Sequence, residues 1–226
     1  MSEGVYNLHM TQTTDIILLI FNCVKYKHKA IQQKQTWLKD FTIIPYFHVI
    51  GNPQLTTEYI FDDTERLLTI KVEDDYNSLP QKVIRAYAAI NAEFNYKYIF
   101  KTDDDQHVNN TKFFNSIAGI SLSKIPNIHY AGNIVHVDKS YLSQYHKIHP
   151  ELPPFLPIKA TKYCSGRFYI LSNAAVKQLL LHQKDIEQEY LEDYAIGYYL
   201  NNTMKTTILH IDTNKYFTDM PEGCNH

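Results

Sequence analysis

The sequence contains few of the residues that characterise disulfide-rich, fibrous or low-complexity chains. Only 3 cysteines, 7 glycines and 9 prolines occur among its 226 residues. Cys23, Cys164 and Cys224 are far apart and form no Cys-x-x-Cys pair, which excludes a disulfide framework and is typical of a reducing compartment. The low glycine and proline content excludes a collagen-like or repetitive chain.

Long hydrophobic runs are also missing. The longest, residues 16–21, is about a third of the length that a bilayer crossing needs. The first residues are polar and lack the basic start and apolar core of a secretory signal. We therefore expect no membrane segment in this chain and a cytoplasmic location, which would be the host cytoplasm if the chain is viral.

Neither sign of charge is in large excess, because the formal net charge is only −2. Such a balance provides no general field for nucleic acid or anionic lipid, so we expect no nucleic-acid partner. The phosphate-binding motifs GxxxxGK[ST] and GxGxxG, the GxSxG serine motif and the Cys–His spacing of zinc sites are all absent. Local groups must hold any anionic ligand.

Strand-like and helix-like segments alternate along the chain. Helical spacing of apolar residues or helix-start signals predict helices over 28–41, 78–90, 173–182 and 192–201. Short apolar runs predict strands over 15–22, 43–50, 67–72, 96–100, 169–172 and 206–211. This alternation indicates an α/β fold with a mostly parallel central sheet and helices on both faces. Segment 125–157 is expected to be mostly loops. We predict a flexible segment over 1–14 and a single domain over 15–226.

Three adjacent aspartates, Asp103, Asp104 and Asp105, follow the strand expected at 96–100. In open α/β sheets, ligands bind at the carboxyl ends of the strands, where this triplet lies. Neighbouring carboxylates repel each other by about 1 kcal/mol per pair at 4 Å in water, and a divalent cation removes that repulsion. Oxygen ligands suit Mg²⁺ or Mn²⁺. A solvated acidic turn is the alternative, and the position after a buried strand favours the metal.

Two further acids, Glu192 and Asp193, open the last expected helix. Acids in a first helical turn stabilise the helix dipole, but a carboxylate held there could also act as a general base. Arg167, after Ser165 and Gly166, could belong to a tight turn or contact a phosphate.

Several blocks occur in an order known from one enzyme family. They are Ala-Ile-Gln-Gln-Lys-Gln-Thr-Trp at 30–37, Asp-Asp-Tyr-Asn-Ser-Leu-Pro-Gln-Lys at 74–82, Lys-Thr-Asp-Asp-Asp at 101–105, Tyr-Cys-Ser-Gly-Arg-Phe-Tyr-Ile-Leu-Ser at 163–172 and Glu-Asp-Tyr-Ala-Ile-Gly at 192–197. In this order the blocks resemble those of the β-1,3-galactosyltransferase and N-acetylglucosaminyltransferase family, which includes the fringe enzymes. Lys34 stands where the family has Arg, and Phe168 replaces its second Gly.

The resemblance implies a GT-A fold and an inverting, metal-dependent glycosyltransferase. Such an enzyme transfers a hexose or N-acetylhexosamine from a UDP-sugar to a hydroxyl of a glycan or glycoprotein acceptor, here of the β-1,3 type. The general base would be Asp193, with Glu192 as the alternative. Mn²⁺ or Mg²⁺ would bind Asp105, Asp103 and His226, with His210 as the alternative histidine.

The resemblance also implies a set of donor-binding residues. They are Phe21, Asn22, Lys34, Asp74, Lys82, Asp103, Asp104, Ser165 and Gly166. A catalytically inactive protein that binds a nucleotide sugar or a glycan on the same fold is the alternative function. The retained Asp193 argues against it, because binding alone would not need that carboxylate.

Overall fold

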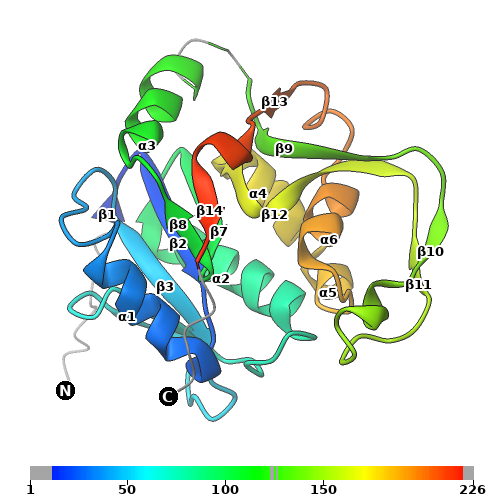
Figure 1. Ribbon diagram of the computed structural model, residues 1–226, viewed down its shortest axis with the longest axis horizontal. Helices are drawn as coiled ribbons and strands as arrows, with labels where there is room; N and C mark the ends of the chain where they lie inside the picture. Colours follow the sequence, from blue (N-terminus) through cyan, green and yellow to red (C-terminus); the bar gives the residue numbers. More distant parts are fainter. Residues whose placement is uncertain (1–11, 123–124, 126, 221–226) are drawn as a thin grey trace, which may run out of the picture.

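The computed structural model describes residues 12–122, 125 and 127–220. Within them, the largest sheet has eight strands in the order β13-β9-β12-β7-β2-β3-β5-β4 (Figure 1). These strands are β2 (Ile16–Phe21), β3 (Tyr46–Gly51), β4 (Tyr59–Asp62), β5 (Leu67–Ile70), β7 (Tyr98–Asp103), β9 (Tyr130–Val137), β12 (Thr161–Ser172) and β13 (Ile208–His210).

The sheet is mixed, with a parallel half around β2. Strand β2 pairs in parallel with β3 and β7, and β3 pairs in parallel with β5. Strand β12 runs antiparallel between β7 and β9, β13 is parallel to β9, and β4 is antiparallel to β5. All six residues of β2 are buried, as expected for a central strand covered on both faces. The predicted α/β fold with a mostly parallel sheet is thus confirmed.

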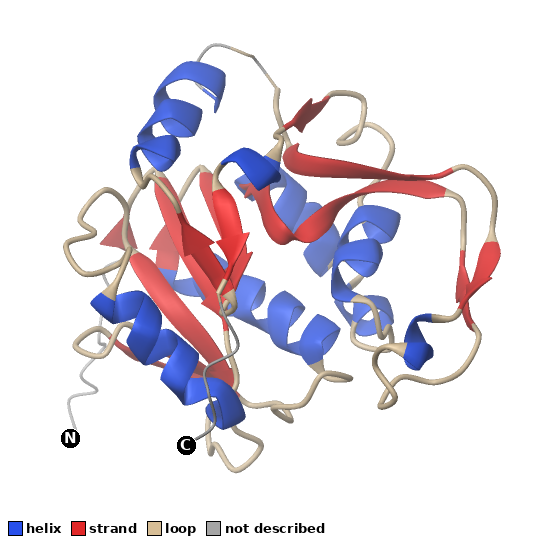
Figure 2. Ribbon diagram, viewed as in Figure 1, coloured by secondary structure: helices blue, strands red, loops and turns tan. Residues whose placement is uncertain are grey.

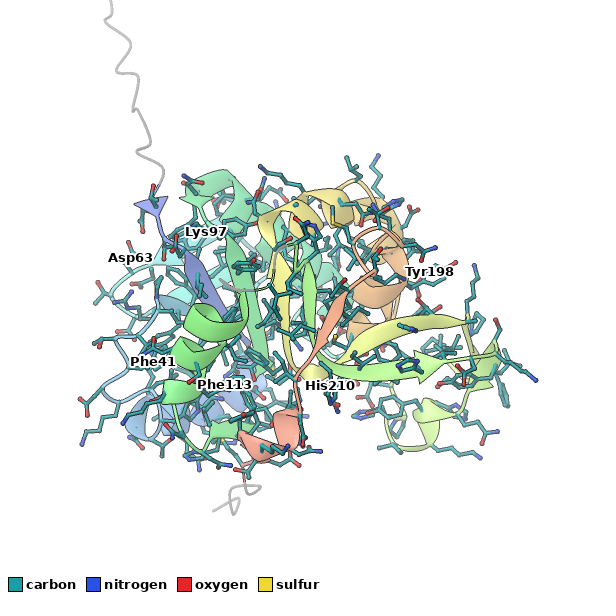
Figure 3. The ribbon with its side chains drawn as sticks, turned by 90° about the horizontal axis from the view of Figure 1, so that it is seen from above. Phe41, Asp63, Lys97, Phe113, Tyr198 and His210 are labelled. Atoms are coloured by element: carbon teal, nitrogen blue, oxygen red, sulfur yellow. The ribbon has the colours of Figure 1, made fainter. Side chains whose placement is uncertain are left out.

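Helices cover both faces of this sheet (Figure 2). They are α1 (Lys27–Gln35), α2 (Leu79–Glu93), α3 (Lys112–Ser116), α4 (Asn173–Leu180), α5 (Gln183–Ile186) and α6 (Glu192–Tyr199). Ile17 and Leu19 of β2 belong to one core cluster with residues of α2, α4, α5 and α6. Leu18 and Ile20 of the same strand belong to a second cluster, which contains Phe113 of α3 on the opposite face (Figure 3). Alternation along one strand therefore builds both cores.

The structure departs from the sequence expectations at several elements. Helix α1 ends at Gln35, although Trp37 and Leu38 after it still pack into the core. Strand β12 is twelve residues long and begins at Thr161, well before the expected 169. Segment 125–157, expected to be mostly loops, contains the long strand β9, whose sequence has no clean apolar alternation.

Smaller sheets complete the fold. β1 (Gln12–Thr13) pairs with β6 (Phe94–Asn95). This strand lies within residues 1–14, which are expected from the sequence to be flexible. β8 (Gln106–Val108) pairs with β14 (Phe217–Asp219). β10 (Tyr141–Ser143) and β11 (Leu156–Ile158) form an antiparallel pair. In the described part of the chain, no helix has the length and apolar character to cross a membrane.

Helix α6 packs directly on the backbone of β12 at Gly197. A Cβ at this position would lie 2.2 Å from Tyr163 Cβ and 2.7 Å from Tyr163 Cα. Because neither atom can move without shifting the strand, only glycine permits this approach.

We expect Gly197→Ala to lower the free energy of unfolding by about 1–3 kcal/mol, because overpacking outweighs the gain in helix propensity. Urea unfolding measures it. Gly119→Ala is the control, since a Cβ there would meet no described atom within 4 Å. Equal stability of Gly197→Ala and the wild type would contradict the close packing.

Candidate active site

Several of the predicted site residues lie at the carboxyl ends of β2 and β7. Phe21 and Asp103, the last residues of these strands, are register partners. A pocket of about 370 Å³ opens beside them. Its lining residues are Asp103, Asp105, Gln106, Asn133, Ser165, Arg167, Thr213 and Asn214. The chain therefore places polar groups from β7, β8, β9, β12 and the segment after β13 around one space.

A bulge in β12 carries Ser165 and Arg167 to the pocket. Cys164 pairs with Ile134 and Tyr169 with Gly132, so five steps along β12 match two along β9. A bulge of this kind bends the strand and re-aims its side chains. Gly166 at its centre approaches the acids closely, because a Cβ there would lie 3.6 Å from Asp103 Oδ2 and 3.7 Å from Asp193 Cβ.

Lys101 is the buried cation beneath these acids, with 1% of its surface exposed. Its Nζ donates to Asp103 Oδ1 at 2.7 Å and to the Gly166 carbonyl at 2.8 Å, and it lies 3.1 Å from Glu192 Oε2. Burial opposes the charge, but the carboxylates of Asp103 and Glu192 outweigh it and raise the pKa of Lys101. One ammonium thus links β7, the bulge of β12 and the start of α6.

The three aspartates of the triplet have three different environments. Asp103 is paired with Lys101, and burial raises its pKa to about 6. Asp104 lies 3.4 Å from Lys29 Nζ, and burial raises its pKa to about 7. Asp105 accepts a hydrogen bond from Gln106 Nε2 at 2.8 Å and, among the described residues, forms no ion pair. It is therefore the carboxylate of the triplet that a cation could approach.

The oxygen atoms available in the pocket suit a hard divalent cation. Asp105 and Asp103 both line the pocket and offer oxygen atoms, which Mg²⁺ and Mn²⁺ prefer. No cluster of three or more His, Cys, Asp or Glu with a metal-binding arrangement occurs in the described residues. The described protein atoms would thus supply only part of a coordination shell, as is usual for an ion that keeps waters and substrate phosphates.

Glu192 and Asp193, at the start of α6, differ in the groups that their carboxylates contact. Glu192 is 5% exposed, accepts a hydrogen bond from Tyr169 through Oε1 and pairs with Lys101 through Oε2. Asp193 accepts from the Gly166 amide at 3.0 Å and from the Tyr194 amide at 2.7 Å, and burial raises its pKa. Side-chain partners occupy both oxygens of Glu192, whereas Asp193 is oriented by backbone amides.

Another ionic contact joins three of the predicted donor-binding residues. Lys82 Nζ donates to Asp74 Oδ1 at 2.6 Å and to the Asn22 carbonyl at 2.8 Å. Asp74 also accepts from the amides of Val24 at 2.6 Å and Gly51 at 2.7 Å. These bonds join the ends of β2 and β3 to α2 and shape this edge of the sheet.

None of the remaining predicted residues that the structure describes lines the pocket. Phe21 ends β2 beside Asp103, but its ring is buried in the core in edge contact with Tyr87. Lys34 Nζ donates to the Glu65 carbonyl at 2.7 Å, at the turn between β4 and β5. His210 is exposed on the edge strand β13 (Figure 3) and does not line the pocket. His226 lies outside the described residues.

Sequence reasoning missed Lys101 and several pocket residues. Lys101 follows three residues of the strand, Tyr-Ile-Phe, and a lysine within a buried strand was the available signal. No motif or pattern in the sequence marks Asn133, Thr213 or Asn214 as site residues. They reach the pocket only because β9 pairs with β12 and β13.

Comparison with known proteins agrees with this architecture. One solved structure, that of a glycosyltransferase involved in the glycosylation of the major capsid of PBCV-1, superposes with a TM-score of 0.51 at 13% identity, over 88% of this chain and 82% of that chain. The fold is that of GT-A-like glycosyltransferases.

Similarity in sequence to known proteins identifies the family within this fold. Residues 29–212 match the model of the galactosyltransferase family. UDP-GalNAc:beta-1,3-N-acetylgalactosaminyltransferase 1 of Mus spicilegus is 30% identical over 147 residues, which are 64% of this chain and 43% of that protein. Its Homo sapiens counterpart is 29% identical over the same length. The chain belongs to the galactosyltransferase family, as its motifs predict, and its match covers less than half the length of these relatives.

We expect Lys101→Met to destabilise the protein by about 3–5 kcal/mol, because it leaves the buried carboxylate of Glu192 and the partly exposed carboxylate of Asp103 without their cation. Urea unfolding measures the loss. Lys97→Met is the matched control, since Lys97 directly precedes the same strand and forms an exposed pair with Asp15, and it should change stability by about 1 kcal/mol or less. Equal effects of the two substitutions would contradict the central role of Lys101.

Proposed function

We propose that the chain is an inverting, metal-dependent glycosyltransferase that transfers a hexose or N-acetylhexosamine from a UDP-sugar to an acceptor hydroxyl. The observation that carries the proposal is that two kinds of carboxylate lie near one glycine. A Cβ at Gly166 would lie 3.6 Å from Asp103 Oδ2 and 3.7 Å from Asp193 Cβ, and Asp105 lines the pocket together with Asp103. The proposed cation-binding carboxylates and the proposed base therefore lie close to each other.

On the donor side, Asp105 with Asp103 would hold Mn²⁺ or Mg²⁺. When bound, such an ion supplies charge neutralisation for the nucleoside diphosphate leaving group. Arg167 lines the same pocket and brings a fixed positive charge, which Asp219 partly balances at 2.8 Å. Lys101 holds Asp103 in place from below, so its positive charge is not free to bind the donor.

On the acceptor side, Asp193 would take the proton from the acceptor hydroxyl. The hydroxyl oxygen then forms a bond to the anomeric carbon, and the bond from that carbon to the diphosphate breaks on the opposite face. UDP leaves with the electron pair. General-base catalysis of this kind contributes about 10²–10⁴-fold. The two amides that bind Asp193 fix its orientation, and its raised pKa makes it a stronger base.

The names of the relatives suggest which donor to examine first. Both are named as UDP-GalNAc enzymes that form β-1,3 linkages. We therefore propose UDP-GalNAc as the first donor and the β-1,3 linkage as the first product to seek.

The test is UDP release from a panel of UDP-sugars, with and without Mn²⁺, together with calorimetric binding of UDP. We expect Asp105→Asn to abolish Mn²⁺-dependent UDP binding. Asp193→Asn should keep UDP binding and lower turnover by about 10²–10⁴-fold, because only the base is lost. Asp63→Asn, at an exposed turn (Figure 3), is the matched charge control. UDP binding that Asp105→Asn leaves intact would refute the metal site, and UDP binding without turnover on any donor would favour the inactive binding protein.

We also expect the turnover rate to fall on acidification. The fall should occur at a higher pH than it would if the base were an aspartate of ordinary pKa. The base must be ionised to act, and burial raises the pKa of Asp193 above the usual value of about 3.9. Activity should therefore be lost as the pH falls through that raised pKa. Turnover at saturating donor and Mn²⁺ between pH 4 and 8 measures it, and a rate that stays flat down to about pH 4 would exclude Asp193 as the base.

A further inference from the structure

Gln106, the first residue of β8, directly follows the acidic triplet, lines the pocket and is only 4% exposed. Its Nε2 donates to Asp105 Oδ1 at 2.8 Å and to Asp219 Oδ1 at 2.9 Å. An ionised carboxylate only accepts hydrogen bonds, so the nitrogen end of the amide must face both acids. One buried amide therefore joins the proposed metal ligand Asp105 to β14, which pairs with β8 (Figure 1).

The backbone of the turn between β7 and β8 is held by other groups. Gln33 of α1 donates through Nε2 to the Gln106 carbonyl at 2.9 Å and to the Asp103 carbonyl at 3.3 Å, so one amide clamps both ends of the turn. Trp37 Nε1 also donates to the Gln106 carbonyl, at 3.2 Å. These bonds do not involve the side chain of Gln106, which instead acts on the Asp105 carboxylate.

The aspartates of the triplet are held by groups of different charge. The ammonium group of Lys101 lies 2.7 Å from Asp103. That of Lys29 lies 3.4 Å from Asp104. Asp105 is instead held by a neutral amide, which orients a carboxylate without compensating its charge. A divalent cation is attracted most strongly to a carboxylate whose charge is uncompensated.

The charge of Arg167 is directed to Asp219 rather than to Asp105. Among the described residues that line the pocket, Arg167 is the only cationic one. Its Nη2 donates at 2.8 Å to Asp219 Oδ1, the oxygen that also accepts from Gln106. Gln106 therefore lies between a carboxylate that is paired with a cation and one that is not.

Packing alone does not explain a glutamine at this position. Gln106 Oε1 is buried and accepts no hydrogen bond from the residues that the structure describes. A buried acceptor without a partner lowers the stability of the fold, and an apolar side chain of similar length would avoid that cost. The two hydrogen bonds of Nε2, by contrast, act directly on the acids of the site.

We propose that Gln106 is a positioning residue for the divalent cation of the donor site. Its amide fixes Oδ1 of Asp105 and leaves Oδ2 and the negative charge to the cation. The inference rests on the proposed function, in which Asp105 and Asp103 bind Mn²⁺ or Mg²⁺, and adds the group that keeps Asp105 available. Hydrogen-bond partners of metal ligands typically contribute about 10–100-fold to metal affinity.

The test measures Mn²⁺ binding itself, by electron paramagnetic resonance of the free ion in the presence of excess UDP. Gln106→Met nearly preserves the length of the side chain but removes the hydrogen-bond donor. We expect it to weaken Mn²⁺ binding about 10–100-fold, while urea unfolding shows that the variant remains folded. An unchanged Mn²⁺ affinity would overturn the proposal.

Gln183→Met is the matched control. The Gln183 amide also donates to a carboxylate at 2.8 Å, that of Glu187 at the end of α5, and neither residue lines the pocket. This variant should leave Mn²⁺ affinity unchanged.

Gln106→Lys keeps the proposal testable if Gln106→Met fails to fold. An ammonium group can donate to both Asp105 and Asp219, so it supports the fold while it compensates their charge. We expect this variant to remain folded and to bind Mn²⁺ at least about tenfold more weakly than the wild type. Wild-type Mn²⁺ affinity in Gln106→Lys would overturn the proposal.

The outcomes separate the role of Gln106 from the proposed function. Mn²⁺ binding that Asp105→Asn abolishes and Gln106→Met leaves unchanged would overturn the role of Gln106 alone. A wild-type protein that binds no Mn²⁺ in the presence of UDP would overturn the metal-dependent function itself, and the role of Gln106 with it.

Discussion

The active-site edge depends on one buried ammonium group. Lys101 contacts a carboxylate of its own strand, a carbonyl in the β12 bulge and a carboxylate of α6. A buried charge is tolerated only when it is paired and hydrogen-bonded, so these three partners must stay together for the chain to fold. The same requirement holds Asp103, Gly166 and the start of α6 in one arrangement. Stability and the geometry of the proposed site are thus set by the same contacts.

Close backbone approach supplies the second constraint. Helix α6 reaches β12 because residue 197 is glycine, and the bulge of β12 reaches the acids at Gly166. As a result, the Gly166 amide of β12 donates to Asp193, which also accepts from the amide of the next residue of α6, Tyr194. The hydrogen-bond chain from Tyr87 through Tyr169 to Glu192 fixes the neighbouring acid in the core. Two adjacent carboxylates therefore have different environments, and we assign the structural role to Glu192 and the proposed chemical role to Asp193.

Much of the fold and part of the site could be predicted from the sequence. The continuous apolar run of β2 and the helical spacing of α2 identified a covered parallel sheet, and the acidic triplet identified the edge of the sheet at which the pocket lies. The length of β12 and the strand β9 could not be predicted, because their residues lack alternation and pair only through long-range contacts. Lys34 was assigned to the donor site from a motif position, whereas its ammonium group bonds to Glu65.

The sequence alone determined the fold class, the family and the candidate acids, because apolar periodicity and short motifs are local properties of the chain. Only the tertiary structure decided which acid is paired, which is accessible and how Gln106 joins Asp105 to Asp219. Those properties depend on residues far apart in sequence. Lys29 reaches Asp104, and Gln106 donates to Asp219. Burial and pairing, rather than residue type, decide what a carboxylate can do, and both arise only when the strands and helices pack together.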